Sequence, residues 1–584
     1  MFDLKNKVVL VTGAARGIGA GVARSVLDKG AKHVAILDVN SELGTALQDE
    51  LRSKHGNESA KFIKCDVTKD LDAAFKETVG KFGYIDVVVN NAGIMNDAPH
   101  IYEKEIAINV TALITSSLKA YNMMNKNDGG KGGTIINISS IVALFQSYLL
   151  PVYSATKSAV LQFSNCLETV ESLKIKCFSI ILILINYHYL FVACKIKLVL
   201  KYRFIIMLVC YLKSIKKLVV CKVGLLTIVE HDNQNYSRTG VRVVTICFGC
   251  TETNLIQGAI GGVDKQIEQL IPVGISKIVD SAVRGLIEVY EKGASGSTWL
   301  VTSGRPAEEI TQMAYESVNV RWDFEGKVFL VTGGAAGVGA GLVRTLLSHN
   351  AQHVAFLDIA EREGAALEGE LSTKFGALRA KFIKCDVADE TQLAAAYSQV
   401  LDKYRRLDAV VNNAAITNVA NVNSFKKIVD INFIATVTST YKALDVMAVD
   451  KGGNGGAIVN ISSLLALKPS ARLPVYAATK AAVLQFSNNI ATDELFSKTQ
   501  VKIATVCLGP TDTAILLRNS FEILYKDPNQ AIPFESAVSG ILDVISNGAN
   551  RTTWVVADNS PAVDITENVR KGFQYLTENI PTLH

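Results

Sequence analysis

Short apolar runs alternate with amphipathic segments along most of the chain. The first run, Lys7–Thr12, is rich in β-branched residues, and a helical pattern follows it from Ala20 to Lys29. Further short apolar runs, each followed by a turn or a helical pattern, lie at Val34–Asp38, Lys61–Val67, Asp86–Asn91, Thr134–Ser140 and Val241–Ile246. Strands that alternate with amphipathic helices predict an α/β fold built on a doubly wound parallel sheet.

The same order of predicted strands and helices begins again at Lys327–Thr332. The heptapeptide Lys-Phe-Ile-Lys-Cys-Asp-Val is identical at Lys61 and Lys381, and Ala-Val-Leu-Gln-Phe-Ser-Asn is identical at Ala159 and Ala482. A repeat of this period indicates a duplicated domain rather than a solenoid. We therefore predict two tandem Rossmann-type domains, residues 1–318 and 319–584.

One apolar insertion, at about residues 172–233, interrupts the first repeat. Its stretch Ser172–Val229 consists mainly of Ile, Leu, Lys, Val, Tyr, Cys and Phe, with no proline and no acid. Phe178–Cys194 and Leu198–Leu212 approach the length of a membrane span but contain interior polar residues. Three interpretations are open: translated noncoding sequence, a surface insertion with its own packing, or a membrane hairpin. The composition favours the first.

Composition and charge exclude several other classes of protein. The chain has 584 residues, of which 49% are hydrophobic, so it is not a disordered chain. Its net charge is +5, but ten lysines and arginines lie in Ser172–Val229, and the rest of the chain is net acidic. A nucleic-acid partner is therefore not expected. The N-terminus has no signal-like apolar core and the cysteines form no Cys-x-x-Cys pair, so we expect reduced thiols and a cytoplasmic protein.

A glycine-rich turn follows the first predicted strand and precedes the first predicted helix. In Gly13-Ala-Ala-Arg-Gly17-Ile-Gly19, glycine would let the backbone approach a pyrophosphate, which the N–H groups of the helix N-terminus would bind. The next strand ends in Asp38, which can accept hydrogen bonds from an adenosine ribose and would repel a 2′-phosphate. NAD is therefore favoured over NADP, although Asp38 could also be an ordinary strand-end cap.

A tyrosine and a lysine four residues apart occur in both repeats. Tyr153 and Lys157 lie on one helix face, as do Tyr476 and Lys480, and an ammonium near a phenol favours the phenolate. Such a hydroxyl can exchange a proton with an alcohol near neutral pH. A serine lies thirteen residues before each tyrosine, in the shared sequence Asn-Ile-Ser-Ser.

Taken together and in this order, these motifs resemble the short-chain dehydrogenase/reductase family over both halves, apart from the insertion. They are Thr-Gly-x-x-x-Gly-x-Gly, Asp-Val, Asn-Asn-Ala-Gly and the ordered Asn, Ser, Tyr and Lys positions. The sequences Gly-Ser-Thr-Trp299 and Arg-Thr-Thr-Trp554 are similar to those of insect-type alcohol dehydrogenases and 15-hydroxyprostaglandin-dehydrogenase-like proteins.

The resemblance implies a role for each matched residue. Tyr153 and Tyr476 would be the acid/base groups, and the two lysines would lower the tyrosine pKa and hold the nicotinamide ribose. Serines would hydrogen-bond the substrate oxygen and asparagines would support a proton path; these residues are Ser140, Ser463, Asn109 and Asn432. The implied cofactor contacts are Gly13, Gly17, Ile18, Gly19, Asp38, Asp66, Val67, Asn91, Thr251, Gly333, Gly337, Val338, Gly339, Asp358, Asp386, Val387, Asn413 and Thr511. No metal site is implied.

Some positions depart from the family pattern. The usual Pro-Gly after the sixth strand is Phe248-Gly249 in the first half and Leu508-Gly509-Pro510 in the second. Asn-Asn-Ala-Gly becomes Asn-Asn-Ala-Ala415, which we expect to affect the backbone near the adenosine side. The insertion begins at the end of the helix that carries Tyr153, so we expect the second half to be the more active one.

The sequence therefore predicts an NAD-dependent oxidoreductase that interconverts a secondary alcohol and a ketone. Ile141–Phe145 and Leu464–Leu467 follow the two serines, and they either line a pocket for an apolar substrate or belong to the core. The halves could pack as an intramolecular pseudo-dimer, or the chain could form homo-oligomers. Two alternatives remain: an NAD-binding pseudoenzyme or storage-type protein, and a membrane-tethered reductase using Phe178–Leu212.

Overall fold

The computed structural model describes most of both halves. The described residues are 3–144, 147–168, 176–177, 181–182, 241–248, 299–301, 308–309, 323–417, 423–470, 473–511, 532–557 and 559–578. Most of the predicted insertion, together with Gly249 and Thr251, lies outside them.

The first half contains a parallel sheet in the strand order β3-β2-β1-β4-β5-β8-β6. Its strands are β1 (Val8–Thr12), β2 (His33–Asp38), β3 (Ala60–Lys64), β4 (Val87–Asn90), β5 (Gly133–Ser140), β6 (Lys176–Cys177) and β8 (Val241–Phe248). Its helices are α1 (Gly17–Asp28), α2 (Ser41–His55), α3 (Leu71–Phe82), α4 (Tyr102–Ile106), η1 (Ala107–Ala112), α5 (Leu113–Met124) and α6 (Pro151–Glu168). Short β7 (Ile181–Leu182), β9 (Trp299–Val301) and β10 (Glu308–Glu309) form a separate small sheet.

The second half repeats this order as β13-β12-β11-β14-β15-β16-β17-β18. Its strands are β11 (Val328–Thr332), β12 (His353–Asp358), β13 (Ala380–Lys384), β14 (Ala409–Asn412), β15 (Gly456–Ser463), β16 (Val501–Leu508), β17 (Thr552–Val556) and the antiparallel edge strand β18 (Val563–Asp564). Its helices are α11 (Gly337–Ser348), α12 (Glu361–Phe375), α13 (Glu390–Tyr404), α14 (Asn423–Val429), η6 (Asp430–Ile434), α15 (Ala435–Met447), α16 (Pro474–Ile490), α17 (Asp493–Thr499), α19 (Phe534–Asn547) and α20 (Thr566–Glu578).

The predicted tandem α/β architecture is confirmed. The central strands are continuous apolar runs because helices cover both faces of each sheet, and β1 and β11 are buried at every position. Strand order reverses beside β1 and β11, which places the carboxyl ends of β1 and β4, and of β11 and β14, at a crevice. Open α/β sheets bind their ligands at this point.

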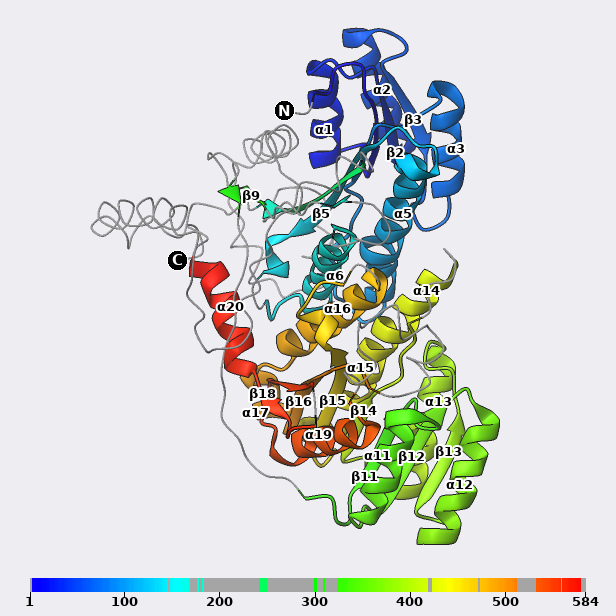
Figure 1. Cartoon of the computed structure of the whole chain (residues 1–584), viewed down its shortest axis with the longest axis vertical. Coiled ribbons are helices and arrows are strands. Elements are labelled where there is room, and N and C mark those ends of the chain that lie inside the picture. Colours follow the sequence, from blue (N-terminus) through cyan, green and yellow to red (C-terminus); the bar gives the residue numbers. More distant parts are fainter. Residues whose placement is uncertain are drawn as a thin grey trace, which may run out of the picture.

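The two halves pack together through α6 and α16, which lie side by side at the centre of the molecule (Figure 1). Ala155 and Ala159 of α6 belong to the same buried cluster as Ala478 and Ala482 of α16. Each alanine follows a tyrosine or lysine of the paired Tyr/Lys motif by two positions, which puts it on the opposite side of the helix. Small side chains let the two helices approach closely, while Tyr and Lys face away from the contact.

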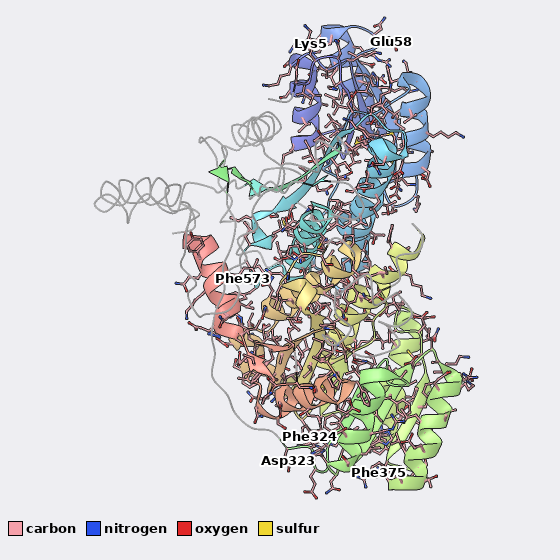
Figure 2. All side chains as sticks on the ribbon, viewed as in Figure 1. Lys5, Glu58, Asp323, Phe324, Phe375 and Phe573 are labelled. Atoms are coloured by element: carbon pink, nitrogen blue, oxygen red, sulfur yellow. The ribbon has the colours of Figure 1, made fainter. Side chains whose placement is uncertain are left out.

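The remaining elements extend away from this central helix pair. Lys5 and Glu58 mark the outer end of the first half, and Asp323 and Phe375 mark that of the second (Figure 2). Within the described ranges, every helix is too short or too polar to cross a bilayer.

Candidate active site

The glycine turns have a backbone that other residues would strain. Gly13 and Gly17 adopt φ values of +62° and +56°, in the left-handed region. Gly19 has an ordinary φ, but a Cβ there would lie 2.3 Å from the Gly13 carbonyl oxygen. The second half repeats this geometry at Gly333, Gly337 and Gly339, with φ values of +64° and +53° and a distance of 2.1 Å. Each turn therefore brings bare backbone to the N-terminus of a helix.

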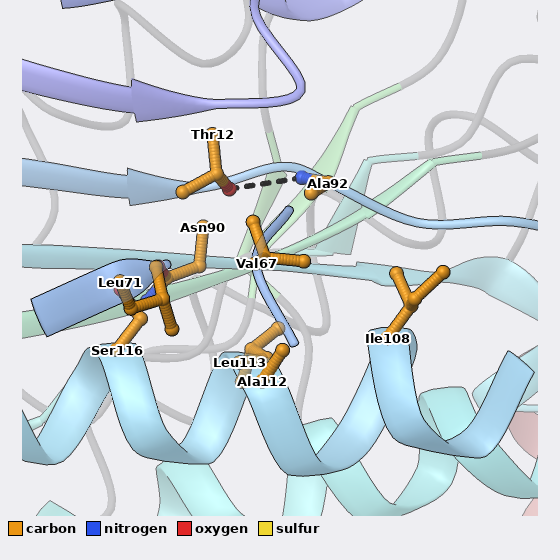
Figure 3. Close-up of a pocket in the computed structure, with 9 residues that line it drawn as sticks. All are labelled: Thr12, Val67, Leu71, Asn90, Ala92, Ile108, Ala112, Leu113 and Ser116. Atoms are coloured by element: carbon orange, nitrogen blue, oxygen red, sulfur yellow. Dashed lines mark hydrogen bonds between the residues drawn. The ribbon is translucent and has the colours of Figure 1, made fainter. Parts of the chain in front are cut away.

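Asn91 and Thr12 hold the first turn in place. Asn91 Nδ2 donates to the carbonyl oxygens of Thr12 at 3.0 Å and of Gly13 at 2.9 Å. Thr12 Oγ1 in turn accepts from the backbone N–H groups of Asn91 and Ala92, both at 3.0 Å, and Figure 3 shows the Ala92 bond. Asn413 makes the equivalent bonds in the second half. The side chains of both predicted asparagines thus shape the turn.

Val67 lies beside this turn and lines a small cavity. The cavity measures about 10 Å³, and Leu71 and Ile108 lie on its other sides (Figure 3). Val387 is the buried counterpart of Val67. Both valines follow a strand end that faces the crevice.

The acidic residues at the ends of β2 and β12 are tied to the glycine turns. Asp38 Oδ2 accepts from Ala15 N at 3.0 Å and Oδ1 accepts from Asn40 N at 3.0 Å. Asp358 makes the same pair of bonds with Ala335 and Ala360. Asn40, not Asp38, caps helix α2. A carboxylate can accept further bonds, so Asp38 and Asp358 remain suited to a ribose hydroxyl.

Other predicted cofactor contacts lie at the ends of strands or helices. Ile18 and Val338 are buried in the first turns of α1 and α11. Asp66 Oδ1 accepts from the Thr68 amide and hydroxyl, bonds that lower the Asp66 pKa. Asp386 accepts from Ala388 N in the same way. Thr511 is buried and its hydroxyl donates to the Gly509 carbonyl.

The paired tyrosines and lysines adopt the same arrangement in both halves. Lys157 Nζ lies 5.5 Å from the centre of the Tyr153 ring, and Lys480 Nζ lies 5.7 Å from that of Tyr476. Each lysine donates to a carbonyl of the neighbouring strand, Ile138 at 3.2 Å or Ile461 at 2.8 Å. Burial lowers the pKa of Lys480 to about 8, so the ammonium form still predominates at pH 7.

Asn109 and Asn432 lie in short π-helical turns, η1 and η6, that interrupt otherwise regular helices. Such turns are frequent at functional sites. Asn109 is fully buried, with Oδ1 accepting from Ile94 N at 2.9 Å and Nδ2 donating to Ile94 O at 2.8 Å. Nδ2 also lies 3.2 Å from Thr156 Oγ1, one residue before Lys157. Asn432 repeats these bonds with Ile416 and Thr479.

Both predicted serines end the strand that adjoins the tyrosine helix. Ser140 Oγ accepts from Val142 N at 3.4 Å, and Ser463 Oγ accepts from Leu465 N at 3.2 Å. The preceding serines fix the strand to the helix, because Ser139 and Ser462 donate to the carbonyls of Lys157 and Lys480. The structure thus brings Asn, Ser, Tyr and Lys together in each half.

A buried carboxyl pair beside Tyr153 was missed by the sequence analysis. Asp97 caps helix α6, accepting from Val152 N at 2.6 Å and from Tyr153 N at 3.0 Å. Glu105 is fully buried, and its Oε1 accepts from Asn96 N. Burial raises the pKa of Asp97 to about 6, and burial together with Asp97 raises the pKa of Glu105 well above its usual range. Glu105 Oε2 accepts nothing from the described N–H and O–H groups, so a proton shared with Asp97 satisfies both carboxyls.

The described residues of the second half contain no counterpart of this pair. Ile428 takes the place of Glu105, at the same distance of four residues before the asparagine, and it is fully buried. The Glu103-Lys104-Glu105 sequence gives no hint of burial, since alternating charges are typical of an exposed helix.

Gly93, which Ala415 replaces in the second half, lies beside the asparagine and the lysine. A Cβ at Gly93 would lie 3.2 Å from Asn109 Oδ1 and 3.5 Å from Lys157 Nζ. The expected effect of Ala415 on the backbone near the adenosine side stays a prediction.

The apolar residues after the serines pack against the tyrosine helices. Ile141–Ala143 and Leu464–Ala466 form short 3₁₀ turns, η3 and η8, that contact α6 and α16. The first turn is more buried than the second. A larger hollow of about 440 Å³ lies between α11 and α19, lined by Phe324, His349 and Phe534, and contains no predicted site residue.

Comparison with known proteins agrees with this geometry. The short chain dehydrogenase family model matches residues 7–185 and 327–521. Similar proteins include 15-hydroxyprostaglandin dehydrogenase [NAD(+)] of Rattus norvegicus, 36% identical over 259 residues that cover 43% of this chain and 94% of the relative. The Homo sapiens enzyme of that name is 36% identical over 38% of this chain and 84% of its own length. Alcohol dehydrogenase 1 of Ceratitis cosyra is 31% identical over 32% of this chain and 72% of its own.

Both halves thus match the family separately and carry its ordered residues at one sheet edge. The chain belongs to the short chain dehydrogenase family, as a tandem duplicate, and is an oxidoreductase of that family.

Proposed function

We propose that the chain is an NAD-dependent oxidoreductase that interconverts a secondary alcohol and a ketone. One observation carries this proposal: a buried lysine lies one helical turn from a tyrosine in each half. Their helix contacts both the strand that ends in the serine and the turn that carries the asparagine. That set can hold a substrate oxygen and move a proton at it. The relatives described above carry names of dehydrogenases that act on alcohols.

The glycine turns fit a dinucleotide. A Cβ at Gly19 or Gly339 would fill the space against the turn carbonyl, so only bare backbone fits where a pyrophosphate would lie. Asp38 and Asp358 place a negative charge beside each turn, which favours NAD over NADP. The names of two of these relatives include NAD(+). When bound, NAD supplies the hydride acceptor or donor.

The chain's own residues would handle the proton. In the direction of oxidation, Tyr476 Oη takes the proton from the alcohol while Lys480 stabilises the phenolate. Ser463 Oγ already accepts from Leu465 N, which orients its hydroxyl hydrogen for donation to the substrate oxygen. Asn432 holds the π-helical turn against the loop at Ile416 and supports the path by which the proton leaves. Tyr153, Lys157, Ser140 and Asn109 take the same roles in the first half.

We propose that the second half is the more active one. Tyr476 is partly exposed, whereas Tyr153 is 5% exposed. The chain between α16 and β16 is short and contains only α17, whereas the insertion follows α6 directly. The substrate therefore reaches Tyr476 more readily.

The test is the absorbance of NADH at 340 nm during incubation with a panel of secondary alcohols, using NAD or NADP. We expect NADH to form with NAD and at least tenfold more slowly with NADP, because each turn carries an acid at the ribose position. NADH binding without turnover of any alcohol or ketone would instead favour the storage-type or pseudoenzyme alternative.

A further inference from the structure

Each tyrosine helix carries a buried glutamine on the side that faces the other half. Gln162 follows Ala155 by seven residues, almost two helical turns, and therefore lies on the same face of α6. Its Nε2 donates to the Leu465 carbonyl of the second half at 2.6 Å. Gln485 of α16 donates to the Val142 carbonyl of the first half at 3.3 Å. The glutamines are 323 residues apart, as are Tyr153 and Tyr476, so the two bonds are related by the pseudo-two-fold symmetry of the duplication.

The residues that accept these bonds also hold the serines of the site. Leu465 N donates to Ser463 Oγ, and Val142 N donates to Ser140 Oγ. A single residue therefore connects each serine to a glutamine of the opposite half. Both connections pass through the short turns η3 and η8, which directly follow the two serines in the chain.

We propose that Gln162 and Gln485 are positioning residues that act across the interface between the halves: each orients the serine turn of the opposite half. This inference rests on the proposed function of the serines. If it holds, each site depends on both halves, because each serine turn is held by a glutamine that the other half supplies.

The chemistry of glutamine suits this role. Its amide N–H donates to the carbonyl, and both glutamines are at most 8% exposed, so water does not readily replace them. Loss of the donor would leave a buried carbonyl without its partner. The turn would then shift to find another, and small displacements of a positioned group lower the rate strongly.

The decisive experiment compares effects within a half and across the interface. In a Tyr153→Phe variant only the second site turns over. Gln162→Met, which keeps the side-chain length but removes the donor, is added to that variant. We expect kcat to fall roughly three- to thirtyfold, with the KM for NAD nearly unchanged because the glycine turn is untouched. The matched variant is Gln485→Met, on the same helix as Tyr476, for which we expect a smaller loss.

If each glutamine instead supported only its own helix, Gln485→Met would lower kcat at the second site more than Gln162→Met. An equal or larger loss in Gln485→Met, or no loss in Gln162→Met, would overturn the inference.

Hydrogen exchange supplies a second readout that needs no turnover. Gln162→Met should accelerate exchange in a peptide that contains Leu465 more than in one that contains Val142, and Gln485→Met should do the opposite. If no alcohol is oxidised but this crossed pattern appears, the proposed function fails while the structural coupling stands. Unchanged exchange at both turns would refute the coupling itself.

Discussion

Lys157 and Lys480, the lysines proposed for catalysis, make equivalent hydrogen bonds but differ in the charges that surround them. Lys157 faces the buried Glu105 carboxyl, an attraction that lowers the pKa of that acid against the larger effect of burial. In the second half Ile428 stands in place of Glu105, and burial lowers the pKa of Lys480 to about 8. Tyr441 of the second half also faces the pair, and burial together with Asp97 contributes to its raised pKa.

The Asn, Ser, Tyr and Lys positions are therefore the same in both halves, whereas the residues around them differ. Asp97 caps the start of α6, and Glu105 lies in α4, directly before η1, the turn that carries Asn109. The first half therefore places a titratable pair beside the helix of Tyr153 and Lys157. The second half fills the same space with an apolar side chain. Motif identity therefore does not imply an identical pH response.

The largest effect is expected from adding a methyl group to the glycine turns. Gly339→Ala would place a Cβ 2.1 Å from the Gly333 oxygen, and Gly19→Ala would place one 2.3 Å from the Gly13 oxygen. The turn must distort, so each variant should lose one NADH site, and calorimetric titration should find one site per chain where the parent has two.

Matched controls exist on neighbouring helices. A Cβ at Gly80 of α3 or at Gly369 of α12 would meet no atom within 4 Å. Gly80→Ala and Gly369→Ala should therefore keep both sites and stabilise their helices by about 0.5–1 kcal/mol. Two intact sites in Gly19→Ala or Gly339→Ala would show that the turns do not hold the dinucleotide.

A medium effect is expected at the carboxyl pair. The pKa of Asp97 is about 6 in the folded chain, above its ordinary value of 3.8, so the folded state retains a proton that the unfolded chain has released. This contribution to stability is present below pH 4 and is lost as pH rises through about 6. The pKa of Glu105 is also raised, so this carboxyl costs stability as pH rises. Glu105→Gln removes that titration and can still donate to Asp97, so it should raise stability at pH 7.5 relative to pH 5 by about 1–3 kcal/mol.

Urea unfolding of the first half at both pH values measures this difference. Asp402→Asn, at an exposed position of α13, removes one carboxylate as a control for net charge. Parallel pH profiles for Glu105→Gln and the parent would show that the two acids do not share a proton.

The smallest effect is expected from exchanging Gly93 and Ala415, the matching residues of the two halves. Gly93→Ala places a Cβ 3.2 Å from Asn109 Oδ1, which must move by a few tenths of an ångström. Ala415→Gly removes the equivalent methyl group. We expect each change to alter kcat of its own half by less than about tenfold, measured with the opposite tyrosine changed to phenylalanine. A complete loss of rate in either variant would mean that this position controls the site.

Much of the fold followed from sequence because its signals are local. Apolar runs, glycine turns and polar strand ends repeat in order along the sequence. In the structure the apolar runs form the strands of the two predicted sheets. Asn109, Ser140, Tyr153 and Lys157 were identified together because the family order is specific, and their assembly at one crevice follows from parallel strands.

What sequence did not reveal depends on tertiary packing. Glu105 lies in a charged stretch that resembles a solvated face, and its burial arises from contact with elements distant in sequence. Gln162 and Gln485 lie in the identical heptapeptide Ala-Val-Leu-Gln-Phe-Ser-Asn, and a glutamine between two large apolar residues was the available signal. Only the packing of α6 on α16 shows which carbonyls the two amides reach.

Initial rates of NADH formation in Tyr153→Phe, Tyr476→Phe and the double variant decide whether the two tyrosines are the acid/base groups. We expect Tyr476→Phe to remove most of the activity and the double variant to lose at least roughly a hundredfold, while all three still bind NADH. A double variant that turns over at the parent rate would contradict the assignment of both sites. An intact rate in Tyr476→Phe, combined with its loss in Tyr153→Phe, would reverse the order of the halves.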